Sequence, residues 1–84
     1  MKYTVLWKPS AENELADIWI NAGDRALVSR AANEIERCLT ADPSAQGESR
    51  GGVTRILFVR PLAVLYDIYE QDVQVAVLRV WSVG

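Results

Sequence analysis

Hydrophobic and polar residues alternate at the start of the chain. In residues 3–7, YTVLW, β-branched and aromatic residues dominate a two-residue repeat, which predicts an opening strand. From Pro9 the period changes to the three- and four-residue spacing of an amphipathic helix. Pro9 suits the first turn of this helix, or Ser10 caps it instead, and Gly23 ends it. The apolar stripe of this first helix comprises Ala11, Leu15, Ile18, Trp19 and Ala22.

A second helix is predicted to follow at once, with Asp24 as its N-cap. Asp42-Pro43 ends it. Because so few residues separate the two helices, we expect a helical hairpin. The apolar stripe of the second helix comprises Leu27 or Val28, Ala31, Ile35, Cys38 and Leu39.

The second half of the chain combines a polar segment with three strand-like runs. Residues 42–54, DPSAQGESRGGVT, are rich in Pro, Ser and Gly and predict a loop, which at this length often carries function. Residues 55–60, 62–70 and 73–81 predict strands, separated by Pro61 and by a turn around Gln71-Asp72. Short connections of this kind favour antiparallel neighbours.

The predicted order is β-α-α-β-β-β, a two-layer α+β fold in which a helical hairpin packs on one face of a mainly antiparallel sheet. The 84 residues correspond to a single domain with a small core. This arrangement leaves the other face of the sheet open, and we expect a functional site there.

Arginines stand at the margins of the apolar strands. Alternation places Arg60 on the side of Phe58, and Arg79 on the side of Val77 and Trp81. An arginine in such a place either extends into solvent, pairs with an acid such as Asp67 or Glu70, or binds a phosphate with two hydrogen bonds. Trp81 serves either as packing or as a platform for a base.

Composition excludes several classes of site. There is one cysteine, Cys38, and no histidine, so an internal disulfide, a Cys/His metal site, a serine triad and a histidine-dependent ribonuclease are all excluded. No metal or cofactor is expected. No apolar run approaches the roughly 18 residues that cross a bilayer, and MKYTVLWK lacks the pattern of an export signal. We therefore expect a cytoplasmic protein without membrane contact.

The net charge of −2 is unevenly distributed. Residues 9–49 carry eight acids and three arginines, whereas residues 50–84 carry four arginines and three acids. The second half could therefore present a mildly basic face to RNA or DNA, or the two halves could be ordinary solvated surfaces.

Four segments together resemble the RelE/ParE superfamily of bacterial toxins over essentially the whole chain. They are the helix entry WKPSAENELADIW, the loop GESRGG, the central hairpin RILFVRPLAVLYDI and the final strand VAVLRVW. The resemblance implies a type II toxin-antitoxin module, with roles in growth arrest and plasmid stabilisation. It also implies a cognate antitoxin whose helix and extended segment wrap the toxin.

RelE-like members cut mRNA in the ribosome, which requires cations for the phosphate, a base and an acid. The resemblance makes Glu48 the candidate base, and Arg60 and Arg79 the candidate phosphate ligands. Four further residues are candidates for contacts with substrate or partner: Arg50, Arg55, Phe58 and Trp81.

The chain also departs from the RelE pattern. Ile56 and Phe58 stand where RelE-like enzymes place lysines, Ala63 stands in place of an arginine, and Trp81-Ser82 replaces the terminal catalytic pair. ParE-like members bind and poison DNA gyrase without cutting RNA, which suits an apolar face. The resemblance therefore predicts a RelE-type mRNA interferase, with a ParE-like gyrase inhibitor or a catalytically silent member as the alternative.

Overall fold

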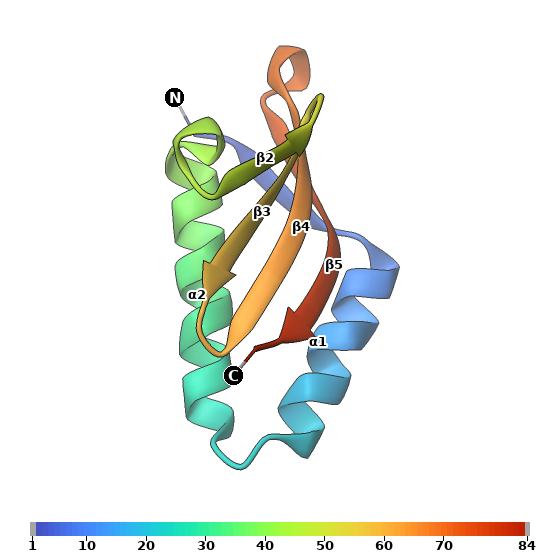
Figure 1. The fold of residues 1–84 in the computed structure, drawn as a ribbon, viewed down its shortest axis with the longest axis vertical. Helices are drawn as coiled ribbons and strands as arrows, with labels where there is room; N and C mark the ends of the chain where they lie inside the picture. Colours follow the sequence, from blue (N-terminus) through green and yellow to red (C-terminus); the bar gives the residue numbers. More distant parts are fainter. Residues whose placement is uncertain (1, 84) are drawn as a thin grey trace.

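The computed structural model describes residues 2–83 and places two helices against one five-stranded sheet (Figure 1). The strand order is β1-β5-β4-β3-β2, with β1 parallel to β5 and every other pair antiparallel. This confirms the predicted α+β architecture. The elements are β1 (Thr4–Trp7), α1 (Pro9–Asn21), α2 (Arg25–Ala41), the 3-10 turn η1 (Pro43–Ala45), β2 (Glu48–Gly51), β3 (Thr54–Val59), β4 (Leu62–Tyr69), the 3-10 turn η2 (Glu70–Asp72) and β5 (Gln74–Ser82).

The helical hairpin forms where the apolar periodicity predicts it. Pro9 occupies the first turn of α1, and the Asp24 carboxylate accepts a hydrogen bond from the Leu27 N–H at the start of α2. In Figure 1 the helices meet at their short connection and diverge from it, with α1 beside β5. Within residues 2–83, neither of these helices has the length and hydropathy needed to cross a membrane.

The core lies between the helices and one face of the sheet. Ile35 and Leu39 of α2 are fully buried, and burying a side chain of this kind contributes about 1.5–3 kcal/mol. Leu15 and Ile18 of α1 pack against the same core. The sheet supplies alternate residues of its strands to it: Val5, Trp7, Leu57, Val59, Leu62, Val64, Tyr66, Ile68, Val75, Val77 and Val80.

The segment predicted as one long loop is more ordered than its composition indicates. Residues 42–54 contain η1 and β2, and β2 pairs with β3 at the edge of the sheet. The buried Tyr66 hydroxyl lies 2.9 Å from the Pro43 carbonyl and 3.0 Å from that of Gln46. The Arg55 guanidinium donates to the carbonyls of Gln46 and Gly47. These contacts from β3 and β4 hold the segment in place.

A bulge in β5 reverses the faces of its last residues. The β4–β5 register pairs Tyr66 with Val77 but Leu65 with Arg79, so Leu78 is the extra residue. Strict alternation had placed Arg79 and Trp81 on the side of Val77, and that prediction is wrong. Val77 faces the core, whereas Arg79 and Trp81 lie on the opposite face of the sheet.

Val73, between η2 and β5, adopts a left-handed conformation with φ 51° and ψ 47°. This region disfavours β-branched residues and is tolerated by asparagine. We expect Val73→Asn to raise the free energy of unfolding by about 1 kcal/mol in chemical denaturation. Val53→Asn, at an exposed turn residue with no positive φ, is the matched control and should change it less. A loss of stability in Val73→Asn would contradict the expectation.

Candidate functional site

The open face is the face of the sheet that the helices leave uncovered. Pairing across the strands arranges its side chains in three rows. The first row is Phe58, Ala63 and Trp81; the second is Glu48, Ile56, Leu65 and Arg79; the third is Thr54, Asp67, Ala76 and Leu6. The centres of the first two rows are therefore apolar, and the charged residues of these rows, Glu48 and Arg79, stand at the row ends. The third row differs, because it carries Asp67 on the central strand β4.

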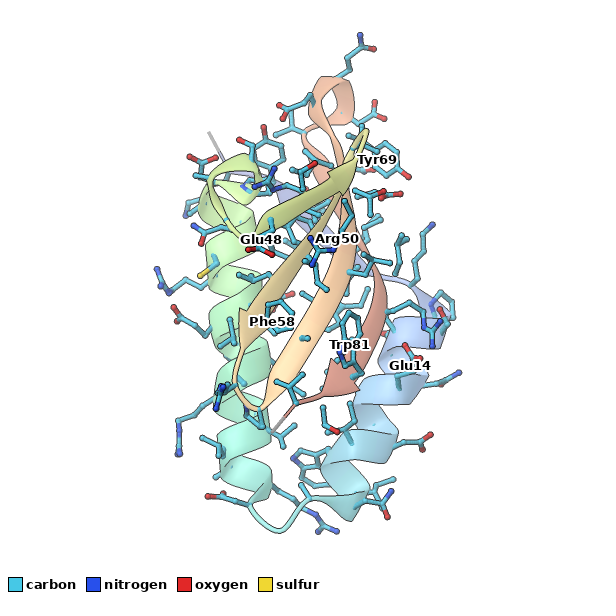
Figure 2. All side chains as sticks on the ribbon, viewed as in Figure 1. Glu14, Glu48, Arg50, Phe58, Tyr69 and Trp81 are labelled. Atoms are coloured by element: carbon cyan, nitrogen blue, oxygen red, sulfur yellow. The ribbon has the colours of Figure 1, made fainter. Side chains whose placement is uncertain are left out.

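Two aromatic residues dominate the open face. Phe58 of β3 and Trp81 of β5 both pair with Ala63 of β4, so they flank one small residue (Figure 2). Phe58 is 51% exposed and Trp81 is 37% exposed, whereas Ala63 is fully buried. Large exposed aromatic side chains beside a small buried residue are typical of an interaction surface.

At the β2 margin, Glu48 and Arg50 form an ion pair. The Glu48 carboxylate lies 3.5 Å from the Arg50 guanidinium, and both side chains are largely exposed. In Figure 2 Arg50 extends from β2 over the strands of the sheet. Each charge at this margin is thus accompanied by one of the opposite sign.

At the β5 margin, Glu14 of α1 binds Arg79. Glu14 Oε2 accepts a hydrogen bond from Arg79 Nε at 2.8 Å and lies 2.7 Å from Arg79 Nη2. The other carboxylate oxygen, Oε1, accepts a hydrogen bond from the Val80 N–H at 3.0 Å. The pKa of the Glu14 carboxyl is lowered, most of all by the hydrogen bond from Arg79 and next by the hydrogen bond from the Val80 N–H. Arg79 was expected to reach solvent, Asp67, Glu70 or a phosphate; its partner is Glu14.

The three candidate catalytic residues stand apart. Glu48 and Arg79 share one row but are separated by β3 and β4, which is three strand spacings or roughly 14 Å between their Cα atoms. Arg79 is engaged with Glu14, on the side away from β2. Arg60 is exposed in the turn between β3 and β4.

Among the four candidates for partner contacts, the structure brings Phe58, Trp81 and Arg50 to the open face. Arg55 is half-buried on the helix side, where it binds the backbone of residues 46–47. Within residues 2–83 no group of three or more Cys, Asp or Glu side chains is placed to hold a metal.

Glu14 is the residue that sequence reasoning missed. It stands on the predicted first helix with nothing to distinguish it from its acidic neighbours. Its role depends on the end of β1 at Trp7 and on the bulge at Leu78, which bring α1 alongside the last residues of β5. Leu6, 47% exposed, was also not expected to belong to the open face.

A second apolar surface lies between the two helices, away from the open face. Trp7 of β1 lines this helix groove, and Ile20 on α1, which also lines it, is 57% exposed. Acids occur at Glu12 and Glu36. Its remaining lining residues are Leu15, Ala16, Trp19, Val28, Ser29, Ala32 and Asn33.

Scans of protein-family models and of curated proteins find no match. Solved structures do match. A chain of the toxin-antitoxin complex RelBE2 from Mycobacterium tuberculosis is 19% identical with a TM-score of 0.81, and the match covers 98% of this chain and 92% of that one. A chain of the chromosomal ParDE system from P. aeruginosa is 16% identical (TM-score 0.72), with 99% and 98% covered. The isolated E. coli RelE toxin is also 16% identical (TM-score 0.70), with 98% and 85% covered. These likenesses show that the chain has the RelE/ParE fold.

Proposed function

We propose, from this RelE/ParE fold, that the chain is the toxin of a bacterial type II toxin-antitoxin module and that a cognate antitoxin binds it. Two of the similar structures are chains of toxin-antitoxin systems, RelBE2 and ParDE, and the likeness extends over nearly the full length of this chain. The exposed aromatic residues of the open face offer an antitoxin segment the anchors that protein interfaces favour.

Of the two modes of action in the superfamily, binding to a target protein is the better supported. The observation that carries it is the open face itself: an apolar centre with Phe58 and Trp81, and two arginines that already have carboxylate partners. A phosphate in a pentacovalent transition state needs unmatched positive charge. A surface that binds another protein needs an apolar area with a polar rim, which is what this face provides. DNA gyrase is the target that the ParE resemblance implies.

Ribosome-dependent cleavage of mRNA is the second candidate. The position of Glu48 and Arg79 in one row of the open face favours it, because a nucleotide bound over Ile56 and Leu65 would lie between a base and a cation. In this mode Arg60 and Arg79 stabilise the phosphate.

Arg79→Ala separates the two modes when the protein is induced in a bacterial host without antitoxin. In the binding mode we expect the variant to keep growth arrest, with accumulated gyrase cleavage complexes and no new RNA ends, because Arg79 supplies no unmatched charge. Arg30→Ala, at an exposed residue of α2, is the matched control. Loss of arrest in Arg79→Ala alone, with wild-type RNA ends mapped inside translated codons, would favour cleavage. No arrest from the wild-type chain would contradict the toxin proposal.

A further inference from the structure

Glu14 occupies a place that the fold creates at the edge of β5. The parallel partner β1 ends at Trp7, opposite Val77, so the backbone of β5 loses its neighbour from Leu78 onward. Two side chains of α1 take over its hydrogen bonds: Ser10 Oγ donates to the Leu78 carbonyl at 3.2 Å, and Glu14 Oε1 accepts from the Val80 N–H at 3.0 Å. Ser10 and Glu14 are one helical turn apart and therefore lie on the same side of α1.

This anchoring distinguishes Glu14 from an ordinary surface acid. Its side chain is 28% exposed, and its Oε1 atom is fixed by the strand backbone. The other oxygen, Oε2, is thereby directed at Arg79, where it contacts both Nε and Nη2. Most exposed ion pairs are weak because two flexible side chains must be ordered together. Here one of the two partners is already held by the fold.

The pair changes what the open face can bind. The bulge at Leu78 places Arg79 on the open face two residues from Trp81, so this face carries both a cation and an aromatic residue, the combination that binds single-stranded nucleic acid. The Glu14 carboxylate holds a fixed negative charge in contact with the Arg79 guanidinium. We infer that Glu14 is a specificity-determining residue: it acts as an internal anion that occupies Arg79 and keeps nucleic acid phosphates off the open face.

Glu14→Gln tests this inference on the full chain. Glutamine can still accept the Val80 N–H, but it carries no charge to match Arg79. With a fluorescein-labelled single-stranded oligouridylate at low salt, we expect the variant to bind about fivefold more tightly than wild type, the effect of one unit charge at contact distance in water. The slope of log K against log salt should steepen by about 0.7 because one more phosphate is neutralised.

Glu12→Gln is the matched control, since it removes the same charge from the same helix at an exposed residue of the helix groove. It should leave RNA affinity within about twofold of wild type. In Glu14→Gln/Arg79→Ala the gain should disappear. The inference is overturned if Glu14→Gln binds RNA no better than Glu12→Gln, or if Glu14→Gln does not bind RNA at all.

A measurement on the wild-type protein covers the case in which Glu14→Gln does not fold. The Nε–H resonance of Arg79 should stay in place when the oligonucleotide is added, because Glu14 remains its partner. Saturable movement of that resonance would overturn the inference. These binding experiments use purified protein and no growth assay. A failure here is therefore distinct from a failure of the proposed toxin function.

Discussion

Gly47→Ala should destabilise the protein by at least about 3 kcal/mol. Gly47 has φ +62°, and a Cβ atom added to it would lie 2.1 Å from the Ile56 carbonyl oxygen. That oxygen belongs to the backbone of β3 and cannot swing aside as a flexible side chain would. In the variant the alanine must therefore adopt a left-handed backbone conformation, and its Cβ atom must also push β2 away from β3. In a domain of this size the melting temperature should fall by roughly 12–24 °C.

Two other glycines provide matched controls for this steric argument. A Cβ on Gly52 would meet nothing within 4 Å, but its φ is +56°, so Gly52→Ala should cost only about 1 kcal/mol. Gly23 has neither a positive φ nor a close neighbour, so Gly23→Ala should be neutral or slightly stabilising. Thermal denaturation of the three variants measures the series. If Gly47→Ala is no worse than Gly52→Ala, the close approach to Ile56 does not constrain the fold.

Gly47 also illustrates what the sequence could not reveal. The segment DPSAQGESRGGVT has the composition of a loop, and no periodicity marks residues 48–51 as a strand. Its structure depends on contacts from distant residues, namely the Tyr66 hydroxyl and the Arg55 guanidinium, which bind its carbonyl groups. Contacts of this kind do not leave a local signal.

The helices and the three long strands were predictable because their signals are local. The stripe ending in Ile35 and Leu39, with Asp24 as the N-cap, defines α2 without reference to the rest of the chain. The parallel pairing of β1 with β5 was not specified by any short connection. The bulge at Leu78 had no composition signal either, so alternation failed in the part of β5 that carries Arg79 and Trp81.

The candidate site was predictable only as a set of residue types. Alternation grouped Arg60 with Phe58 on one strand but could not say which side the helices cover. The neighbourhood of Phe58 and Trp81, 23 residues apart, exists only because both strands pair with β4 at Ala63. Glu14 joins this face through the helix packing, which is a property of the assembled fold.

Phe58→Ser/Trp81→Ser should abolish growth arrest when the protein is induced alone. In protein interfaces, truncating one aromatic anchor costs at least about 2 kcal/mol of binding energy, so losing both should weaken target binding on the order of a thousandfold. The fold should tolerate the change better, because Phe58 and Trp81 are 51% and 37% exposed and only part of their surface is buried. Growth after induction, with equal amounts of folded protein verified by circular dichroism, provides the measurement.

The matched control is Ile20→Ser, which removes an apolar side chain that is 57% exposed on α1 in the helix groove. Its exposure is similar to that of Phe58, so the stability cost should also be similar. Because the helix groove lies away from the open face, growth arrest in the absence of antitoxin should persist in this variant. If growth arrest survives the loss of both aromatic residues but not the loss of Ile20, the surface that binds the target lies on the helices and not on the sheet. An effect confined to Phe58 and Trp81 would place the target of the protein over Ala63.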